Sequence, residues 1–159
     1  MPAGGRLSPG QTADLLGCYG IPLAGGEDPS AATRAGGTEV IIRVEADHTF
    51  GPLVIFGPGG AEPRPAGLMA GHAARLTPLT DIDADQLISS VYPGGTNPRT
   101  LPYVRDLLLR VSRLTDDLPE VTVLDLNPVT AWPDRAIVTA ALITAAPCEP
   151  PDPFLRKLR

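Results

Sequence analysis

Apolar and polar residues alternate in two neighbouring stretches, from Thr38 to Ala46 and from Gly51 to Phe56. Both stretches are rich in Val and Ile, and this alternation is typical of strands that bury one face. The short polar segment between them suits a turn. The pattern therefore predicts a hairpin of two strands, and Ala73 to Leu79 follows as a shorter strand that ends at Pro78.

Helix-capping residues begin the first predicted helix. Ser8 is followed by Pro9 and, three positions after the serine, by Gln11, so a capping box and a proline at the first helical position coincide. Gly20 is a stop signal for a helix. The sequence predicts a helix over residues 9–19.

Apolar residues at helical spacing predict two further helices. Thr80 can cap the first, and its apolar face consists of Ala84, Leu87, Ile88 and Val91. A longer apolar stripe predicts a second, core-packing helix over residues 100–117.

A second hairpin is expected near the end of the chain. Val121 to Leu126 and Arg135 to Thr144 have strand composition, and the segment NPVTAWPD between them suits a turn. Strands in adjacent pairs, separated by two consecutive helices, predict an α+β fold. We expect a mainly antiparallel sheet covered by helices on one side.

Composition divides the chain into three expected parts. Residues 1–37 hold the first helix and a linker rich in Gly and Ala, which we expect to be flexible; residues 38–146 form the folded unit; residues 147–159 are a proline-rich tail.

Length and charge narrow the classes of function. The 159 residues are 43% hydrophobic, which suits one soluble domain. No run approaches the roughly 18 apolar residues of a membrane span, and the first residues lack a secretory signal, so we expect a cytoplasmic protein without a membrane partner. The net charge of -5 argues against nucleic acid as a partner.

Glycines follow the second strand of the first hairpin. Gly57, Gly59 and Gly60 have no Cβ, so the backbone there can approach an anionic ligand closely. An ordinary turn is the alternative, because the chain contains neither a dinucleotide-binding nor a P-loop glycine motif.

A carboxylate and an amide occur together in the second hairpin. Period-two alternation would place Val121, Val123, Asp125 and Asn127 on one face, so Asp125 and Asn127 could face a cation together. The alternative is that Asn127 begins a turn with Pro128 and that Asp125 is solvated or caps a loop.

Four segments in this order carry a resemblance to a known family. They are LSPGQTADLLGCYGIPL, GGTEVIIRVEADHTFGPLVIFGPGG, PLT at 78–80, and PEVTVLDLNPV. Together they resemble the ATP-grasp region of NDP-forming acyl-CoA synthetases, the succinyl-CoA synthetase β-subunit-like family, which is also found fused to GNAT protein acetyltransferases. The resemblance implies an ATP-dependent CoA ligase that uses ATP and Mg²⁺, and it makes residues 38–146 similar to the C-terminal lobe of an ATP-grasp fold.

The resemblance also implies particular site residues. Asn127 matches the magnesium ligand, Glu39 matches a ribose contact, and the nucleotide-binding set is Glu39, Gly57, Gly59, Gly60, Asp125 and Asn127. The second magnesium ligand of the family, an Asp, falls at Ala140 in this chain. Magnesium usually takes one or two carboxylates from a protein, so this substitution weakens the expected metal site.

A second departure concerns the first lobe of the fold. Where the family carries a nucleotide-binding lobe with a phosphate-binding lysine, this chain has only residues 24–36, and no lysine occurs before Lys157. The expected function is therefore a degenerate ATP-grasp domain, a pseudoenzyme without independent ligase activity that acts as a protein-interaction or regulatory module. We expect it to bind a protein partner or to form a homo-oligomer. The alternative is a subunit that binds a nucleotide or phosphate ligand and completes an acyl-CoA synthetase active site with a partner chain.

The remaining candidate side chains favour structural roles. His48 and His72 have no Ser or Cys nearby in a nucleophile-like setting, so both are expected in loops or at the surface. Burial is the expectation for Trp132.

Overall fold

The computed structural model describes residues 4–25, 36–47, 49–59, 71–93 and 100–148. These residues form three helices and a seven-stranded sheet. In chain order the elements are β1 (Gly5–Arg6), α1 (Pro9–Cys18), β2 (Thr38–Asp47), β3 (Gly51–Pro58), β4 (Ala73–Leu76), α2 (Asp81–Val91), α3 (Leu101–Asp117), β5 (Val121–Trp132), β6 (Arg135–Val138) and β7 (Ala141–Ala145).

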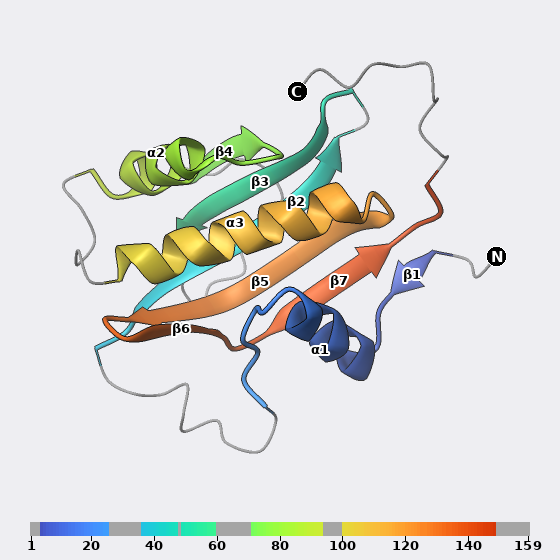
Figure 1. Ribbon diagram of the computed structural model, residues 1–159, viewed down its shortest axis with the longest axis horizontal. Coiled ribbons are helices and arrows are strands. Elements are labelled where there is room, and N and C mark those ends of the chain that lie inside the picture. Colours follow the sequence, from blue (N-terminus) through green and yellow to red (C-terminus); the bar gives the residue numbers. More distant parts are fainter. Residues whose placement is uncertain (1–3, 26–35, 48, 60–70, 94–99, 149–159) are drawn as a thin grey trace.

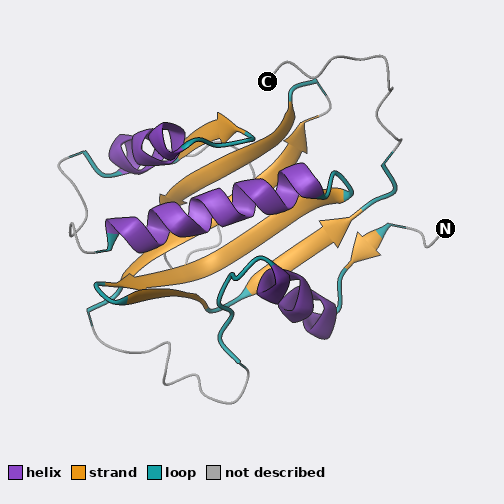
Figure 2. Ribbon diagram, viewed as in Figure 1, coloured by secondary structure: helices purple, strands orange, loops and turns teal. Residues whose placement is uncertain are grey.

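The sheet is antiparallel throughout its named strands, in the order β1-β7-β5-β2-β3-β4, with β6 paired to the second half of β5. All three helices lie on the same face of this sheet, with α3 across its centre (Figures 1 and 2). The expected α+β fold with a mainly antiparallel sheet and helices on one side is confirmed. None of the helices in the described ranges has the length and apolar composition needed to cross a membrane.

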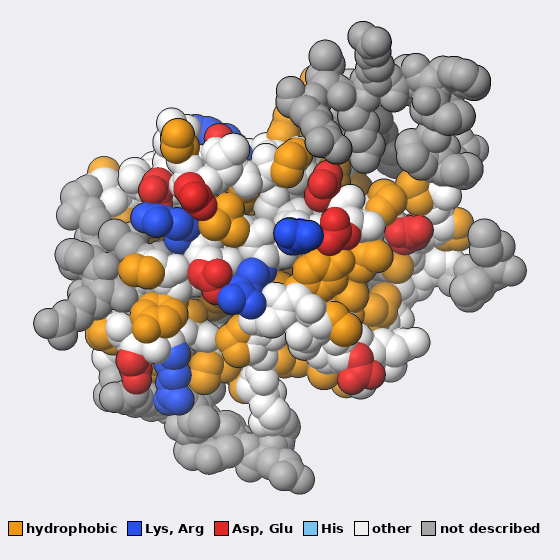
Figure 3. Space-filling view, in the orientation of Figure 1, with side chains coloured by type: hydrophobic (Ala, Val, Ile, Leu, Met, Phe, Trp, Pro, Cys, Tyr) orange, Lys and Arg blue, Asp and Glu red, His pale blue; other side chains and the backbone are white. Residues whose placement is uncertain are grey.

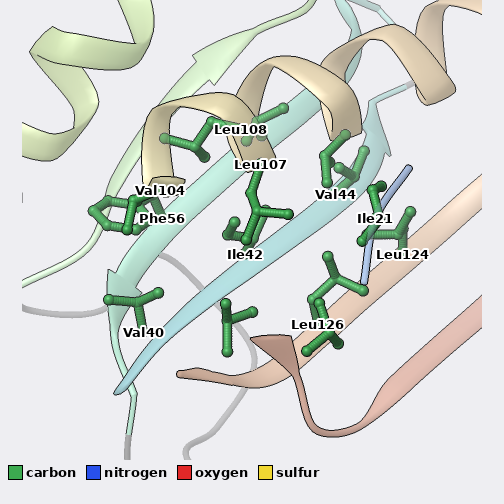
Figure 4. Packing of buried hydrophobic residues seen from close by; sticks show 14 of the residues in the cluster. Ile21, Val40, Ile42, Val44, Phe56, Val104, Leu107, Leu108, Leu124 and Leu126 are labelled. Carbon is green, nitrogen blue, oxygen red and sulfur yellow. The ribbon is translucent and has the colours of Figure 1, made fainter. Parts of the chain in front are cut away.

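The core lies between α3 and the central strands (Figure 4). Val40, Ile42 and Val44 alternate along β2 and are buried beneath the helices. Leu107 and Leu108 from α3 join the same cluster. Complete burial of each such side chain stabilises the fold by roughly 1.5–3 kcal/mol, so this apolar stripe determines which face the helix presents to the sheet.

The outer surface of the helical layer is charged (Figure 3). Acidic and basic side chains are interspersed there, and two pairs are close: Arg105 with Asp85 at 2.7 Å and Arg110 with Asp106 at 2.6 Å. Exposed pairs of this kind contribute little to stability, so they mark a solvated face.

The second hairpin differs from the sequence prediction. The segment predicted to be a turn continues as strand, because β5 runs to Trp132, and the returning strand is divided into β6 and β7. The two strands are offset by a β-bulge. Val40 pairs with Val129 and Ile42 pairs with Leu126, so β5 has one residue more than β2 between these two pairs. The extra residue changes the alternation and returns Val129 to the core.

Alternation also fails at the start of β5. Val121 was expected to share a face with Val123, but the pairing with β7 shifts between these two residues, and Val121 belongs to the core cluster. The expected burial of Trp132 is confirmed, since only 2% of its surface is exposed.

The first helix is integrated with the rest of the fold. The predicted capping box of Ser8 and Gln11 is present, and Leu16 and Ile21 are members of the main core cluster. Arg110 on α3 donates hydrogen bonds to the carbonyl oxygen of Gly20 at 3.1 Å and to that of Tyr19 at 3.2 Å. Most of the expected linker, most of the proline-rich tail, Gly60 and His48 lie outside the described residues, so the division into three parts stays a prediction.

Candidate functional site

Five of the candidate positions meet at one end of the sheet, where β2 begins and β3 ends (Figure 1). Gly59 donates its N–H to the carbonyl oxygen of Glu39 at 2.9 Å, which joins the glycine turn to β2. On the other side of β2, the β5 bulge contains Asn127, whose N–H donates to the carbonyl oxygen of Ala140 at 3.0 Å. The fold thus gathers Glu39, Gly57, Gly59, Asn127 and Ala140.

The glycines of this turn permit close packing within the protein. The imidazole of His72 occupies the space that a side chain at Gly57 would need, and a Cβ on Gly59 would lie 2.8 Å from the backbone of Glu39 and Val40. The N–H of Gly59 is already bound to Glu39. Their internal contacts explain why glycine is required, while binding of a phosphate at Gly57 and Gly59 stays a prediction.

His72 has a closer relation to this site than the sequence indicated. It lies in the loop before β4, as expected, but it is half-buried against Gly57. Its Nδ1 atom is buried and has no hydrogen-bond partner within the described residues. No local sequence signal predicts this contact, because it depends on the pairing of β3 with β4.

Asp125 precedes Asn127 by two residues on β5 and lies within a row of charged residues on the face of the sheet opposite the helices. Arg43 on β2 is its neighbour across the strands, and Arg43 also pairs with Glu45 at 3.1 Å. Burial raises the pKa of Asp125; the positive charge of Arg43 opposes this effect and the negative charge of Glu45 adds to it. Sequence reasoning missed Arg43 and Glu45, since only the strand register brings them to Asp125.

Asn127 is exposed at the bulge, directly opposite Ala140. An Asp at position 140 would place a carboxylate beside this amide, but alanine supplies only a methyl group. Asp125 is held next to Arg43, and among the residues with described positions no group of three His, Cys, Asp or Glu side chains could hold a metal ion. Magnesium prefers several hard oxygen ligands, so the residues present do not fit a magnesium site of ordinary strength.

The antiparallel sheet with helices on one face, and the Asn-Pro bulge within β5, agree with an α+β lobe of ATP-grasp type. A family model for the ATP-grasp domain matches residues 28–145, more than half of the chain. The chain therefore belongs to the ATP-grasp domain family, and the resemblance inferred from the sequence is confirmed.

The relatives are ADP-forming CoA ligases. The chain is 33% identical over 112 residues to the Acetate--CoA ligase [ADP-forming] I subunit beta of Pyrococcus furiosus, a match that covers 66% of this chain and 47% of that subunit. It is 36% identical over 101 residues to Acetate--CoA ligase [ADP-forming] I of Archaeoglobus fulgidus, covering 59% of this chain and 14% of that protein. The chain thus spans less than half the length of these curated relatives.

Solved structures agree with this assignment. A dinucleotide-forming acetyl-coenzyme A synthetase 1 from Ca. Korarchaeum cryptofilum, in complex with coenzyme A and Mg-AMPPCP, superimposes with a TM-score of 0.61 at 32% identity and covers 70% of this chain and 55% of its own. The match to the apo form of that enzyme covers 91% of this chain and 85% of the other, with a TM-score of 0.58. Because the two sequences are only 24% identical, this match supports the fold alone.

Proposed function

We propose that this chain is an ATP-grasp lobe without ligase activity of its own, which acts as a non-catalytic binding subunit in an acyl-CoA synthetase-like assembly. The observation that carries the proposal is the hydrogen bond of Asn127 to Ala140, the position where the resemblance implies a second magnesium ligand. Without that carboxylate, the site offers one amide to a cation.

Electrostatics support the same conclusion. Phosphoryl transfer depends on positioned charges that stabilise the transferring group and its metal ions. Asp125 is already next to Arg43, whose positive charge opposes the binding of a cation at this carboxylate. The interval from residue 24 to 36 is also too short for the lysine-bearing lobe that the resemblance leads us to expect.

The partner surface in this proposal is the sheet face opposite the helices. No helix among the described elements covers it, and Ile41, Leu53, Val123 and Leu142 are half-buried there beside Arg43 and Glu45. Partly exposed apolar side chains around a charged pair suit contact with another protein surface, either a partner chain or a second copy of this one. The Pyrococcus furiosus relative is itself a subunit, which favours association.

Calorimetric titration of the purified chain with Mg-ATP and Mg-ADP tests whether the chain lacks a working magnesium and nucleotide site. We expect no micromolar binding, because one cation ligand and one side of the nucleotide site are missing. Ala140→Asp should raise affinity for Mn²⁺ severalfold by adding a carboxylate beside Asn127. Thr139→Asp, at the exposed neighbouring position, is the matched control and should have a smaller effect.

The second candidate function is a nucleotide-binding subunit that completes an active site with a partner chain. It is favoured by Asn127 and Glu39, both of which are exposed at the same end of the sheet. Micromolar, magnesium-dependent binding of ATP by the unaltered chain, weakened severalfold by Asn127→Ala, would establish this alternative and contradict the first proposal.

A further inference from the structure

The strand β4 forms one edge of the sheet, next to α2 (Figure 1). Its inner side pairs with β3, and Thr77 just after it donates its N–H to the carbonyl oxygen of Pro52 at 3.0 Å. Hydrogen-bonded residues alternate along an antiparallel pair, so the backbone groups of Ala74 and Leu76 point away from β3. No strand among the described residues pairs with this outer side. Two residues of β4 therefore present main-chain donors and acceptors at the sheet edge.

The side chain of Arg75 lies along this edge. Its Nη1 atom donates to the outward carbonyl oxygen of Ala74 at 3.1 Å. Arg75 is exposed and forms no ion pair with any residue that the structure describes. Its positive charge contributes to the lowered pKa of Asp83, but that carboxylate is already bonded to Thr80. Charged side chains protect edge strands from unselective pairing, so this edge is open to a strand that can accommodate the cation.

A groove of about 400 Å³ lies between Arg75 and α2. The residues of α2 that line it are Ile82, Asp85, Gln86, Ser89 and Ser90. Asp85 is bound to Arg105 at 2.7 Å, and the hydroxyls of Ser89 and Ser90 donate to carbonyl oxygens within the helix. Arg75 is therefore the cation that the described lining offers to a ligand, and the exposed side chain of Ile82 adds an apolar wall.

The two faces of this edge differ in polarity. Ala73 packs against the core beneath the helices, so alternation places Arg75 on the helix side with the groove and Leu76 on the opposite side. Leu76 is 46% exposed, and its half-buried neighbour across the strands is Leu53. Residues opposite each other on paired strands interact directly. A strand that matches this edge therefore has an acidic side chain on the helix side and an aliphatic one on the other side.

Charge disfavours a second copy of this chain as the added strand. Antiparallel pairing of two β4 edges that uses both outward residues would place Ala74 opposite Leu76 of the other copy. Arg75 would then lie directly opposite Arg75 of that copy. Like charges in this arrangement destabilise a strand pair. The edge therefore favours a strand of opposite charge from a different protein.

We propose that the β4 edge binds an extended segment of a partner protein, in which an acidic residue is flanked by aliphatic residues. The segment would add to β4 as an antiparallel strand, with main-chain hydrogen bonds to Ala74 and Leu76. Its carboxylate would accept charge-assisted hydrogen bonds from Arg75 in the groove, and one aliphatic neighbour would lie against Leu76. The site goes beyond the proposed function and does not depend on nucleotide binding.

Titration of the full chain with capped peptides, followed by heteronuclear NMR, tests the proposal. The probe is acetyl-Thr-Val-Glu-Val-Thr-amide, and its two counterparts carry Gln or Lys in place of Glu. We expect the Glu peptide to shift the amide resonances of Ala74 and Leu76 and to slow their hydrogen exchange, because their N–H groups become bonded. The Gln peptide should bind roughly fivefold more weakly, and the Lys peptide more weakly still, because the charge-assisted hydrogen bonds are lost.

Two variants assign binding to this edge. Arg75→Glu changes an exposed side chain, so it should retain the fold and reverse the preference in favour of the Lys peptide. Leu76→Pro removes an outward N–H and should weaken binding of the Glu peptide severalfold. Arg113→Gln, at an exposed arginine on α3, is the matched control and should leave affinity unchanged.

Three results would overturn the proposal. The first is that the Glu peptide does not bind, or binds no more tightly than the Gln peptide. The second is that Arg75→Glu leaves the preference among the peptides unchanged. The third is that the resonances of Ala74 and Leu76 respond only to the concentration of the protein itself, which would show that the edge pairs with a second copy.

Discussion

Single glycine positions control how closely the strand ends of this lobe approach one another. At Gly57 the neighbour is the side chain of His72, whereas at Gly59 it is the backbone of β2 at Glu39 and Val40. A side chain can move, but the paired backbone of a central strand cannot move without loss of its hydrogen bonds. The two glycines therefore differ in how a substitution can be accommodated.

Gly57→Ala should lower the free energy of unfolding by about 1–3 kcal/mol, because the new methyl group would overlap the His72 ring. In the His72→Ala background most of this loss should disappear. Gly59→Ala should destabilise at least as much and should not be rescued by any side-chain truncation. Urea unfolding of the single and double variants measures the coupling energy. Equal losses with and without His72 would show that this contact is not the cause.

At the scale of elements, capping boxes mark where α1 and α2 begin. Thr80 caps α2: its hydroxyl oxygen accepts from the N–H of Asp83 at 3.2 Å, and a carboxylate oxygen of Asp83 accepts from the N–H of Thr80 at 2.9 Å. The Thr80 hydroxyl also donates to this carboxylate at 2.6 Å. These side-chain and backbone hydrogen bonds from Thr80 lower the pKa of Asp83.

Thr80→Ala should lower the free energy of unfolding by about 1 kcal/mol near neutral pH. Since the folded pKa of Asp83 lies below its ordinary value of 3.8, its contribution is present above that pH and is lost as the pH falls through the folded pKa. The difference between the original chain and the variant should therefore shrink as the pH falls below 3.8 and through the folded pKa of Asp83. Urea unfolding followed by the fluorescence of buried Trp132 measures this, with Thr80→Ser as the control. A difference independent of pH would contradict the role of the carboxylate.

At the scale of the whole molecule, α1 is part of the main core even though it precedes the segment outside the described residues. Leu16 is fully buried in the same cluster as the central strands. Arg110 of α3 binds the carbonyl groups after the end of α1, where the helix dipole favours positive charge. These contacts couple the N-terminal helix to the rest of the lobe.

Leu16→Ala should lower the free energy of unfolding by about 2–5 kcal/mol and leave one cooperative transition, because it creates a cavity in a shared core. Leu15→Ala, at the half-buried neighbouring position, should cost less. Denaturant unfolding monitored by circular dichroism and by fluorescence measures both. A separate early transition for α1 would show instead that the helix folds as an independent unit.

Local sequence signals were sufficient for most elements. The capping residues Ser8 and Thr80 marked the starts of two helices, and alternation marked the first hairpin. Prediction failed at the β5 bulge, because the extra residue is defined only relative to β2, far away in the sequence. For the same reason Arg43 and His72 could not be assigned to the neighbourhood of the candidate site.

The sequence by itself predicted the α+β class through short-range periodicity and the ATP-grasp family through its resemblance to known proteins, and both are confirmed. The tertiary structure alone decided that Asn127 lies opposite Ala140 at a bulge, that His72 packs on Gly57, and that β4 forms an edge of the sheet beside α2. The physical reason is that strand register and edge pairing are cooperative properties of segments distant in sequence, which no local preference encodes.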